Sequence, residues 1–278
     1  MGILKPVLWV GGAVVAVAGA IAVRSWVTAQ RASIAAGKER LNQTLPVHSA
    51  WWREHAGAEG EILYVAIGDS AAQGIGASVP RNSYVGVIAD HIRAATGRSV
   101  QVVNLSVSGA TVELAVADQL PRLAGHRPHI VTVSIGANDI GDFDAGRFQD
   151  GIRRVFDALP TDAIVADLPC FYLPRNERIV AVANGILRRE AAERGLTVVP
   201  LHETMRREGW RGMLHQFADD WFHPNDRGYR VWASAFLPAV IEQATAKFPR
   251  EAVAPPVNRE AVSDSAPGTT APATRPAR

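Results

Sequence analysis

The chain has 278 residues, with 29 Lys and Arg against 27 Asp and Glu, so its formal net charge is only +2. Such a length accommodates one α/β domain of about 200 residues with additional segments at its ends. The small and scattered charge excludes nucleic acid as a predicted partner, because nucleic-acid binding requires a patch or run of basic residues. Cys170 is the only cysteine, which excludes an internal disulfide and a metal site of clustered cysteines.

Residues 1–24 contain an unbroken run of apolar and small residues from position 7 to position 23. As a helix this run spans roughly 26 Å, slightly less than a bilayer core of about 30 Å. We therefore predict a single transmembrane anchor or signal-anchor over residues 1–24, and a membrane location. A cleaved signal peptide and a secreted protein stay open as the alternative, because Ala18-Gly19-Ala20 fits the small-residue cleavage pattern. The flanking charges leave both sides of the membrane open, since a large domain after one helix can be translocated despite them.

Two further segments are predicted to lie outside the main domain. Residues 25–60 read as a stalk or linker, which is alanine-rich and helical in pattern before Pro46. The Trp51-Trp52 pair at its end is interpreted as packing against the domain edge. Residues 249–278 are rich in Pro, Ala, Thr and Ser, so they cannot bury enough apolar surface to offset the entropy of ordering, and we predict a disordered tail. The domain itself is expected at residues 61–248.

Strand and helix patterns alternate through residues 61–248. Short apolar, β-branched runs predict buried strands at residues 62–67, 100–103, 130–135, 163–168 and 197–201. Apolar residues at three- and four-residue spacing predict helices at residues 84–95, 148–159, 179–194 and 227–245. This alternation predicts an α/β fold: a three-layer α/β/α sandwich around a five-stranded parallel sheet of the flavodoxin-like kind.

Four short motifs carry candidate chemistry. They are Gly68-Asp69-Ser70, Ser108-Gly109-Ala110-Thr111, Gly136-Ala137-Asn138-Asp139 and Asp220-Trp221-Phe222-His223-Pro224. The first three follow the first three predicted strands, so their residues should meet at the rim where ligands bind in parallel sheets. A serine nucleophile requires a base, a group that orients the base, and donors for the negative oxygen formed at the attacked carbonyl. Together the four motifs supply each of these parts.

The motifs in this order resemble those of the SGNH hydrolases, also called the GDSL esterase/lipase family, over roughly residues 61–247. The resemblance implies the SGNH hydrolase fold, with Ser70 as the nucleophile, His223 as the base and Asp220 as the residue that orients the imidazole. It also implies an oxyanion hole made of the backbone N–H groups of Ser70 and Gly109 and the side-chain amide of Asn138. This chemistry requires no metal and no organic cofactor.

The spacing of the acid and the base adds a local prediction. Asp220 and His223 are three residues apart, which on one turn of helix makes them neighbours. Asp219, four residues before His223, is the competing acid, and the Asp-x-x-His pattern of the family selects Asp220. The one departure from the family pattern is Ala71 in place of the usual leucine, which bears on packing and not on the mechanism.

The predicted function is that of a serine esterase or lipase that hydrolyses carboxylic esters through an acyl-enzyme on Ser70. Small-molecule, lipid or glycan esters are the expected substrates, and the predicted anchor favours lipid-like or acylated envelope esters. Two alternatives stay open: an acyltransferase that passes the acyl group to a sugar or lipid hydroxyl, and a catalytically silent membrane-anchored binding module. An α/β-hydrolase elbow does not fit, because Ser70 follows the first strand of the domain.

The motifs leave the shape of the substrate pocket to the loops around them. Residues 173–177 and 206–217 are expected to border the pocket. Four apolar residues of the second segment are predicted either to line an acyl-binding wall or to pack in the core: Trp210, Met213, Leu214 and Phe217. The sequence predicts no oligomeric state.

Overall fold

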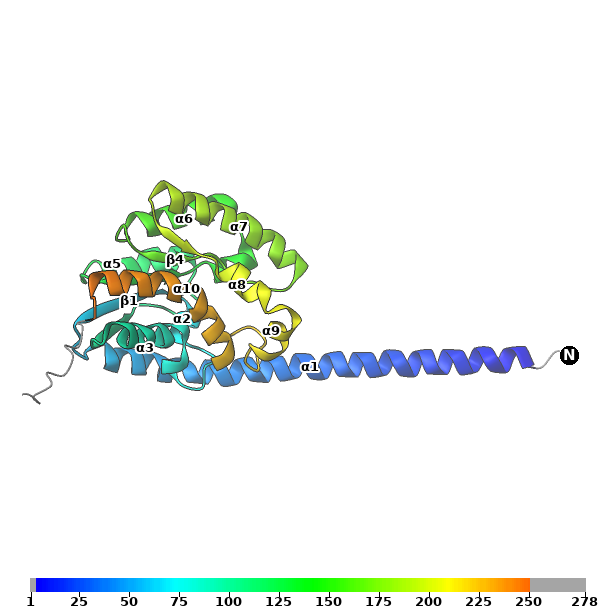
Figure 1. Ribbon diagram of the computed structural model, residues 1–278. Coiled ribbons are helices and arrows are strands. Elements are labelled where there is room, and N and C mark those ends of the chain that lie inside the picture. Colours follow the sequence, from blue (N-terminus) through cyan, green and yellow to red (C-terminus); the bar gives the residue numbers. More distant parts are fainter. Residues whose placement is uncertain (1–3, 251–278) are drawn as a thin grey trace, which may run out of the picture.

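A computed structural model describes residues 4–250 of the chain, with side chains described from residue 23. Five parallel strands form a sheet in the order β2-β1-β3-β4-β5 (Figure 1). The strands are β1 (Ile62–Gly68), β2 (Val100–Asn104), β3 (Ile130–Ser134), β4 (Ile164–Ala166) and β5 (Thr197–Val199). Helices cover both faces of this sheet, so the predicted three-layer α/β/α sandwich is confirmed.

The two faces of the sheet follow from the alternation of side chains along each strand. In β1, Ile62, Tyr64 and Ala66 face the core that contains α3 and α10. Val65 and Ile67 face the second core, against α6 and α7. These helices are α3 (Tyr84–Thr96), α6 (Ala145–Asp157), α7 (Pro174–Glu193) and α10 (Asp226–Lys247). Because both faces are covered, the strands are mainly apolar, as expected for a buried parallel sheet.

The main helices lie close to their predicted positions and differ at their ends. Proline is well suited to a first helical position, so α7 begins at Pro174, five residues before the predicted start. Asn225 caps α10 by accepting the N–H groups of Arg227 and Gly228. The sequence did not predict the shorter elements: α2 (Ser70–Gln73), η1 (Pro80–Asn82), α4 (Val112–Leu114), η2 (Ala115–Gln119), α5 (Leu120–Leu123), η3 (Ala137–Asp142), α8 (Leu201–Arg207) and α9 (Gly209–His215).

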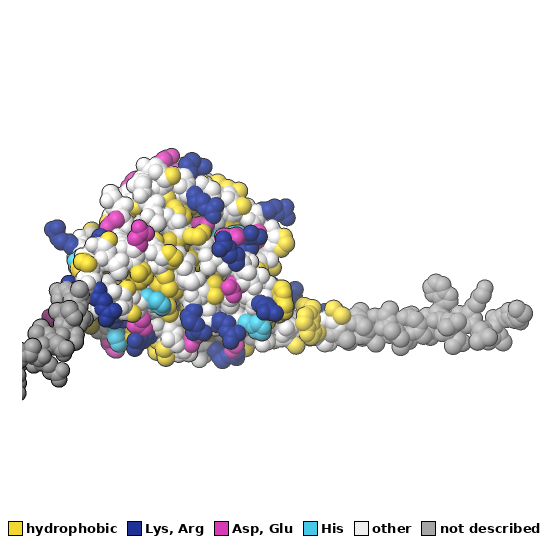
Figure 2. All heavy atoms as spheres, viewed as in Figure 1, with side chains coloured by type: hydrophobic (Ala, Val, Ile, Leu, Met, Phe, Trp, Pro, Cys, Tyr) yellow, Lys and Arg dark blue, Asp and Glu magenta, His cyan; other side chains and the backbone are white. Residues whose placement is uncertain are grey.

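A single long helix, α1 (Leu4–Ala56), precedes the sheet and extends well beyond the domain (Figure 1). It runs through Pro46 without ending and packs against the domain along its second half, where Trp52 is buried. Val23 and Trp26 are exposed, and apolar side chains are visible where α1 leaves the domain (Figure 2). The domain face in that view carries charged side chains of both signs, interspersed.

The structure describes only part of the two segments that the sequence places at the ends of the chain. Among the residues that could be searched, no helix carries an apolar stretch of the length that a bilayer crossing requires. The side chains of the apolar run up to position 22 lie outside the described residues, and so do residues 251–278. The membrane anchor and the disordered tail therefore stay predictions.

Candidate active site

Ser70 lies where β1 ends and the short helix α2 begins. Asp69 is the residue before α2, and its carboxylate Oδ1 accepts the backbone N–H of Ala71 at 2.9 Å. Gly74 ends α2 in the left-handed conformation, with φ of 84°, which glycine adopts without strain. This abrupt strand-to-helix turn fixes Ser70 at the carboxyl end of a central strand, where the residue itself is almost fully buried.

Ser70, His223 and Asp220 form a continuous hydrogen-bonded chain. Asp220 Oδ2 lies 2.6 Å from His223 Nδ1, and His223 Nε2 lies 2.9 Å from Ser70 Oγ. An ionised carboxylate only accepts hydrogen bonds, so Nδ1 is the donor and Nε2 is free to accept the serine hydroxyl. Burial alone would raise the pKa of Asp220, but the hydrogen bonds from the ring and backbone of His223 outweigh it and lower that pKa. The acid is therefore ionised at neutral pH.

The acid and the base lie in an irregular turn, and the expectation that they share a turn of helix is wrong. Asp220 Oδ1 accepts the backbone N–H groups of Phe222 and His223, both at 3.0 Å. Trp221 between them is left-handed, with φ of 56°. A short carboxylate that bonds the N–H groups just after it closes a local turn in place of a helical one. The competing acid, Asp219, points elsewhere and pairs with Arg40 at 2.8 Å.

The remaining two predicted residues lie at the same end of the sheet. Gly109, in the turn after β2, is exposed and left-handed, with φ of 77°. Asn138, in η3 after β3, is half-buried, and its Nδ2 donates to Ala110 O at 2.9 Å and approaches Asp69 Oδ2 at 3.3 Å. The third motif thus contacts residues directly beside both Ser70 and Gly109, and the three strand-end motifs meet at one place.

Two acidic residues inside the motifs received no role from the sequence, although each one positions a motif loop. Burial raises the pKa of Asp69 to about 6, against the opposing effects of the Ala71 N–H and of His223. Asp139 Oδ2 accepts the N–H of Val112 at 3.0 Å and so connects the loop after β3 to the loop after β2. Their positions next to Ser70 and Asn138 in the sequence were the signal that could have identified these roles.

Gln119 supports the nucleophile turn without any sequence signal. Its fully buried amide accepts the N–H of Gly68 at 3.0 Å and donates to the carbonyl of Gly68 at 2.8 Å. Gln119 ends the π-helical segment η2, and such segments are frequent at functional sites. Since no local pattern predicts a π-helix, this contact could not have been anticipated.

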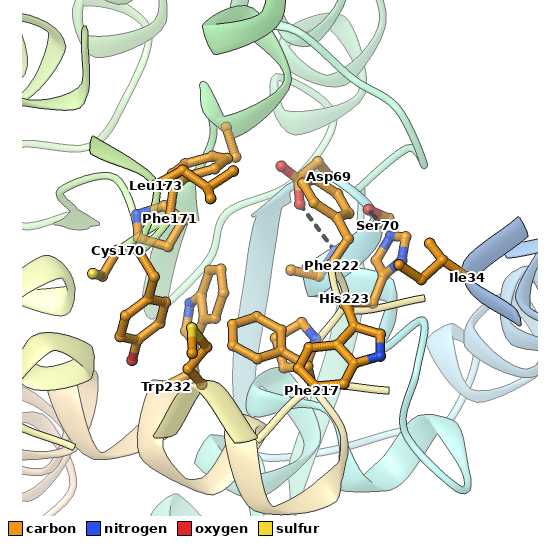
Figure 3. Close-up of a pocket in the computed structure, with 17 residues that line it drawn as sticks. Ile34, Asp69, Ser70, Cys170, Phe171, Leu173, Phe217, Phe222, His223 and Trp232 are labelled. Carbon is orange, nitrogen blue, oxygen red and sulfur yellow. Dashed lines mark hydrogen bonds between the residues drawn. The ribbon is translucent and has the colours of Figure 1, made fainter. Parts of the chain in front are cut away.

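An apolar cavity of about 380 Å³ opens beside Ser70 and His223 (Figure 3). Met213 and Phe217 contribute to its wall, as does Leu173 of the other predicted loop. Trp210 and Leu214 do not line it and are exposed. The sequence missed the remaining apolar and aromatic lining residues: Ile34, Ala71, Ala137, Pro169, Cys170, Phe171, Tyr172, Trp221, Phe222, Pro224 and Trp232.

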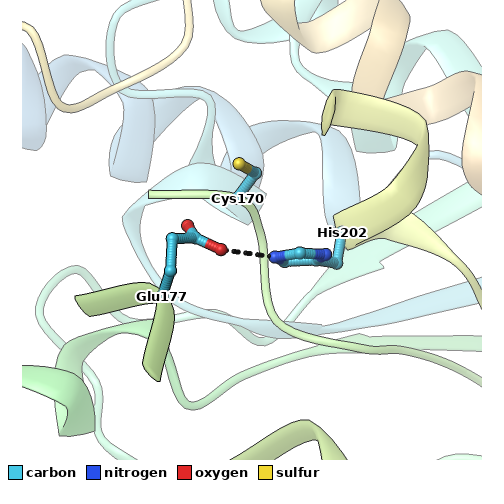
Figure 4. Close-up of side chains that lie close together, drawn as sticks. All are labelled: Cys170, Glu177 and His202. Atoms are coloured by element: carbon cyan, nitrogen blue, oxygen red, sulfur yellow. Dashed lines mark hydrogen bonds and ion pairs between the residues drawn. The ribbon is translucent and has the colours of Figure 1, made fainter. Parts of the chain in front are cut away.

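Cys170, which lines the cavity, belongs to a group of side chains that resembles a metal site in composition. The ligand atoms of Cys170, Glu177 and His202 are all within 4.8 Å of one another, the one such group found among the described residues (Figure 4). However, the Glu177 carboxylate already accepts the N–H groups of Phe171 and Tyr172 and bonds His202 Nε2 at 2.7 Å. Burial also raises the pKa of Cys170 to about 11, which keeps it a thiol. The arrangement holds the loop that forms the cavity wall.

Residues 66–231 match the family model of the GDSL-like lipase/acylhydrolase family. No curated protein matches the chain.

Several solved structures share the fold. LAE5, described as an alpha/beta hydrolase enzyme from the metagenome of Lake Arreo, Spain, is 25% identical with a TM-score of 0.55, over 66% of this chain and 96% of its own. A variant of Axe2, an acetyl xylan esterase from Geobacillus stearothermophilus, is 20% identical with a TM-score of 0.54, over 65% and 94%. The psychrotrophic esterase EstA from Pseudoalteromonas sp. is 18% identical with a TM-score of 0.52, over 66% and 98%.

Proposed function

Because this chain belongs to the GDSL-like lipase/acylhydrolase family and is a serine hydrolase of ester bonds, we propose that Ser70 is its nucleophile, with His223 as general base and Asp220 as the acid. The observation that carries the proposal is the hydrogen-bonded chain from Asp220 through His223 to Ser70. It joins the serine to a histidine 153 positions away in the sequence. Such an arrangement is what activation of a serine hydroxyl requires.

The proposed reaction proceeds through an acyl-enzyme. Ser70 Oγ attacks the ester carbonyl carbon while its proton passes to His223 Nε2, and the carbonyl oxygen becomes negative. The tetrahedral intermediate collapses when His223 returns that proton to the departing alcohol oxygen. Water then attacks the acyl-enzyme with its proton passing to His223, and the acid is released as Ser70 regains its proton. Asp220 holds the ring in the correct tautomer and stabilises the imidazolium formed in each half-reaction.

For the negative oxygen we propose three donors: the backbone N–H groups of Ser70 and Gly109 and the amide of Asn138. The Asn138 amide carries two N–H groups, and one is engaged by the carbonyl of Ala110 at 2.9 Å. The second approaches Asp69 at 3.3 Å, near the outer limit of a hydrogen bond, so an oxyanion can take its place. A neutral donor suits this role because the charge develops only in the transition state.

For the substrate we propose esters with an apolar acyl chain, with lipid-like or acylated envelope esters favoured. The support is the cavity beside Ser70, which is lined mainly by apolar and aromatic side chains and is large enough for a small ligand. Leu173, Trp221 and Phe222 are exposed at its mouth, where an apolar chain would enter. The predicted membrane anchor would bring such esters close.

The test of the mechanism is a short-chain nitrophenyl ester assay on the full chain, with Ser70→Ala and His223→Ala as variants. Triad substitutions typically lower kcat by about 10⁴-fold or more, so both variants should lose nearly all activity. Ser234→Ala is the matched control, because its hydroxyl is exposed and bonds only Val231 O. Full activity in Ser70→Ala, or a fluorophosphonate label on another residue, would refute the assignment.

The test of the substrate class is a series of nitrophenyl esters with increasing acyl length. Each methylene buried in the cavity contributes about 0.8 kcal/mol, so kcat/KM should rise about fourfold per carbon until the cavity is filled. Cleavage of acetylated polysaccharide alone, with no turnover of acyl chains of about eight carbons, would contradict the preference for apolar chains.

A further inference from the structure

Helix α1 contacts the nucleophile helix directly. Trp52 Nε1 donates to the carbonyl of Gln73 at 3.0 Å, and His48 Nδ1 lies 3.1 Å from the same oxygen. Both side chains are buried, and Gln73 is the last residue of α2, the helix that begins at Ser70. The Gln73 side chain in turn donates to Ser106 O, in the loop after β2. The C-terminal part of α1 is thus connected by buried hydrogen bonds to the element that carries the proposed nucleophile.

Three turns earlier, α1 contacts the turn that carries the acid and the base. Gly37 is buried against Asp219, so closely that a Cβ at position 37 would lie 2.5 Å from the Asp219 carbonyl oxygen. Arg40, on the same side of the helix, pairs with the Asp219 carboxylate at 2.8 Å. Asp219 immediately precedes Asp220. Only a residue without a side chain permits this approach of helix and turn, which gives Gly37 a role that its helix propensity does not explain.

One turn further toward the N-terminus, α1 reaches the cavity itself. Ile34 is among the lining residues, and Figure 3 shows it projecting from α1 at the end of the cavity near Ser70 and His223, away from Cys170 and Leu173. Residues 34, 37 and 40 lie three apart, so they follow one side of the helix. This side therefore runs from the cavity wall past the acid and base to the nucleophile helix.

We propose that one side of α1 is part of the active site: Ile34, Gly37, Arg40, His48 and Trp52 hold the nucleophile helix and the acid–base turn in register and wall the cavity at its reacting end. The proposal rests on the proposed function. The physical reason is that the Ser70–His223 hydrogen bond joins two segments distant in sequence, and displacements of about 1 Å in such geometry can cost about a hundredfold in rate. Because α1 lies outside residues 66–231, the family match does not account for this role.

The main test compares Gly37→Leu with Ala36→Leu in the full chain. Ala36 is exposed on the same helix, so the two variants introduce the same side chain toward Asp219 and toward solvent. We expect Gly37→Leu to lower kcat about tenfold to hundredfold with KM within about threefold, because the turn is displaced while the cavity remains. Ala36→Leu should match the wild type. Equal kcat in the two variants, with both folded by circular dichroism, would overturn the proposal.

Two milder variants, Gly37→Ala and Arg40→Ala, test the same contact if Gly37→Leu fails to fold. Gly37→Ala favours the helix intrinsically, so a lower kcat with unchanged or higher helicity would support a positioning role. Arg40→Ala should lower kcat about twofold to fivefold, since exposed ion pairs contribute little, and Arg40→Lys should restore it. Lys38 is exposed on another side of α1, so Lys38→Ala is the matched control. Wild-type kcat in both Gly37→Ala and Arg40→Ala would overturn the proposal.

The cavity wall is tested separately through KM. Ile34→Ala should raise KM about threefold to tenfold with little change in kcat, since it removes apolar contact without touching the turn. Val47→Ala, exposed on α1 away from the cavity, should change neither constant. Unchanged KM in Ile34→Ala would remove Ile34 from the site.

Covalent labelling of Ser70 by a fluorophosphonate distinguishes a failure of the role of α1 from a failure of the proposed function. If wild type is active and labelled at Ser70 but Gly37→Leu labels as fast as Ala36→Leu, then the role of α1 is wrong and the proposed function stands. A wild type that is neither active nor labelled at Ser70 would refute the proposed function, and the role of α1 with it.

Discussion

The loops after β1, β2 and β3 each begin at a hydrogen-bonded strand, whereas the acid–base turn, residues 217–224, connects two helices. The register of the sheet therefore fixes the starting points of the loops that carry Ser70, Gly109 and Asn138. The backbone of the turn is paired locally by a single bridge, between Phe217 and Pro224, by the Trp221 N–H, which donates to Ala218 O at 3.0 Å, and by the bonds of Asp220. The side of the site with the nucleophile is held by the fold, and the side with the base is held by individual contacts.

Further contacts that hold the acid–base turn come from two distant parts of the chain and from the residue that follows the turn. Gly76, in the loop after α2, packs against it, and Gly37 and Arg40 of α1 support it from another side. Asn225 Nδ2 donates to the carbonyls of His215 and Phe217 and closes the turn from within. Because of this difference, substitutions far from the motifs should displace the base, His223, more than the nucleophile, Ser70.

The largest effect is expected on the side held by the sheet. Asn138→Ala should lower kcat about 10²- to 10³-fold with little change in KM, because an oxyanion donor acts in the transition state. Asn138→Asp keeps the size of the side chain but replaces the donor by an acceptor, so it should be at least as inactive. Steady-state kinetics with a thermal melt distinguishes lost chemistry from lost folding. Variants that fold and keep kcat within about threefold would exclude Asn138 from the oxyanion hole.

A somewhat smaller effect is expected where the turn meets Gly76. That residue is left-handed, with φ of 95°, and an added Cβ would lie 2.4 Å from Pro224 O and 3.1 Å from the Cβ of His223. Gly76→Ala should therefore displace the base and lower kcat about a hundredfold.

The matched control for Gly76→Ala is Gly195→Ala. Gly195 is also left-handed, with φ of 67°, but nothing lies within 4 Å of its added Cβ. Both variants should lose about 1 kcal/mol of stability from the strained backbone, Gly76→Ala should lose more because its Cβ meets Pro224 O, and only Gly76→Ala should lose activity. Equal kcat in the two variants would show that the turn does not depend on Gly76.

The same contrast explains how much could be predicted from the sequence. Ser70, Gly109 and Asn138 follow apolar, β-branched runs, and a parallel sheet brings the ends of such runs to one rim. Their meeting place was therefore predictable from local patterns. The conformation of the turn was not, because the bonds of Asp220 to the N–H groups after it and the left-handed Trp221 are local alternatives to a helix that spacing alone does not distinguish.

The role of α1 was beyond the sequence for a different reason. Its residues form a regular helical pattern, but that pattern does not identify the partner of each face. Gly37 reads as a weak point of a helix, and its close approach to Asp219 depends on a contact across 182 positions of sequence, which only the folded chain displays. Ile34 and Gln119 were not predicted for the same reason, because both act through tertiary contacts.

The smallest effect is expected in stability, at the residue between the two regions. Asp69 accepts from Ala71 and Asn138, and burial raises its pKa from 3.8 to about 6. The folded state therefore holds the proton more tightly than the unfolded state does, and this contribution to stability is present below about pH 4 and is lost as the pH rises through about 6. Asp69→Asn removes this dependence. Its free energy of unfolding relative to wild type should therefore rise by about 2 kcal/mol between about pH 4 and pH 7 in urea titrations. Free energies of unfolding of wild type and Asp69→Asn that run parallel between about pH 4 and pH 7 would contradict the raised pKa.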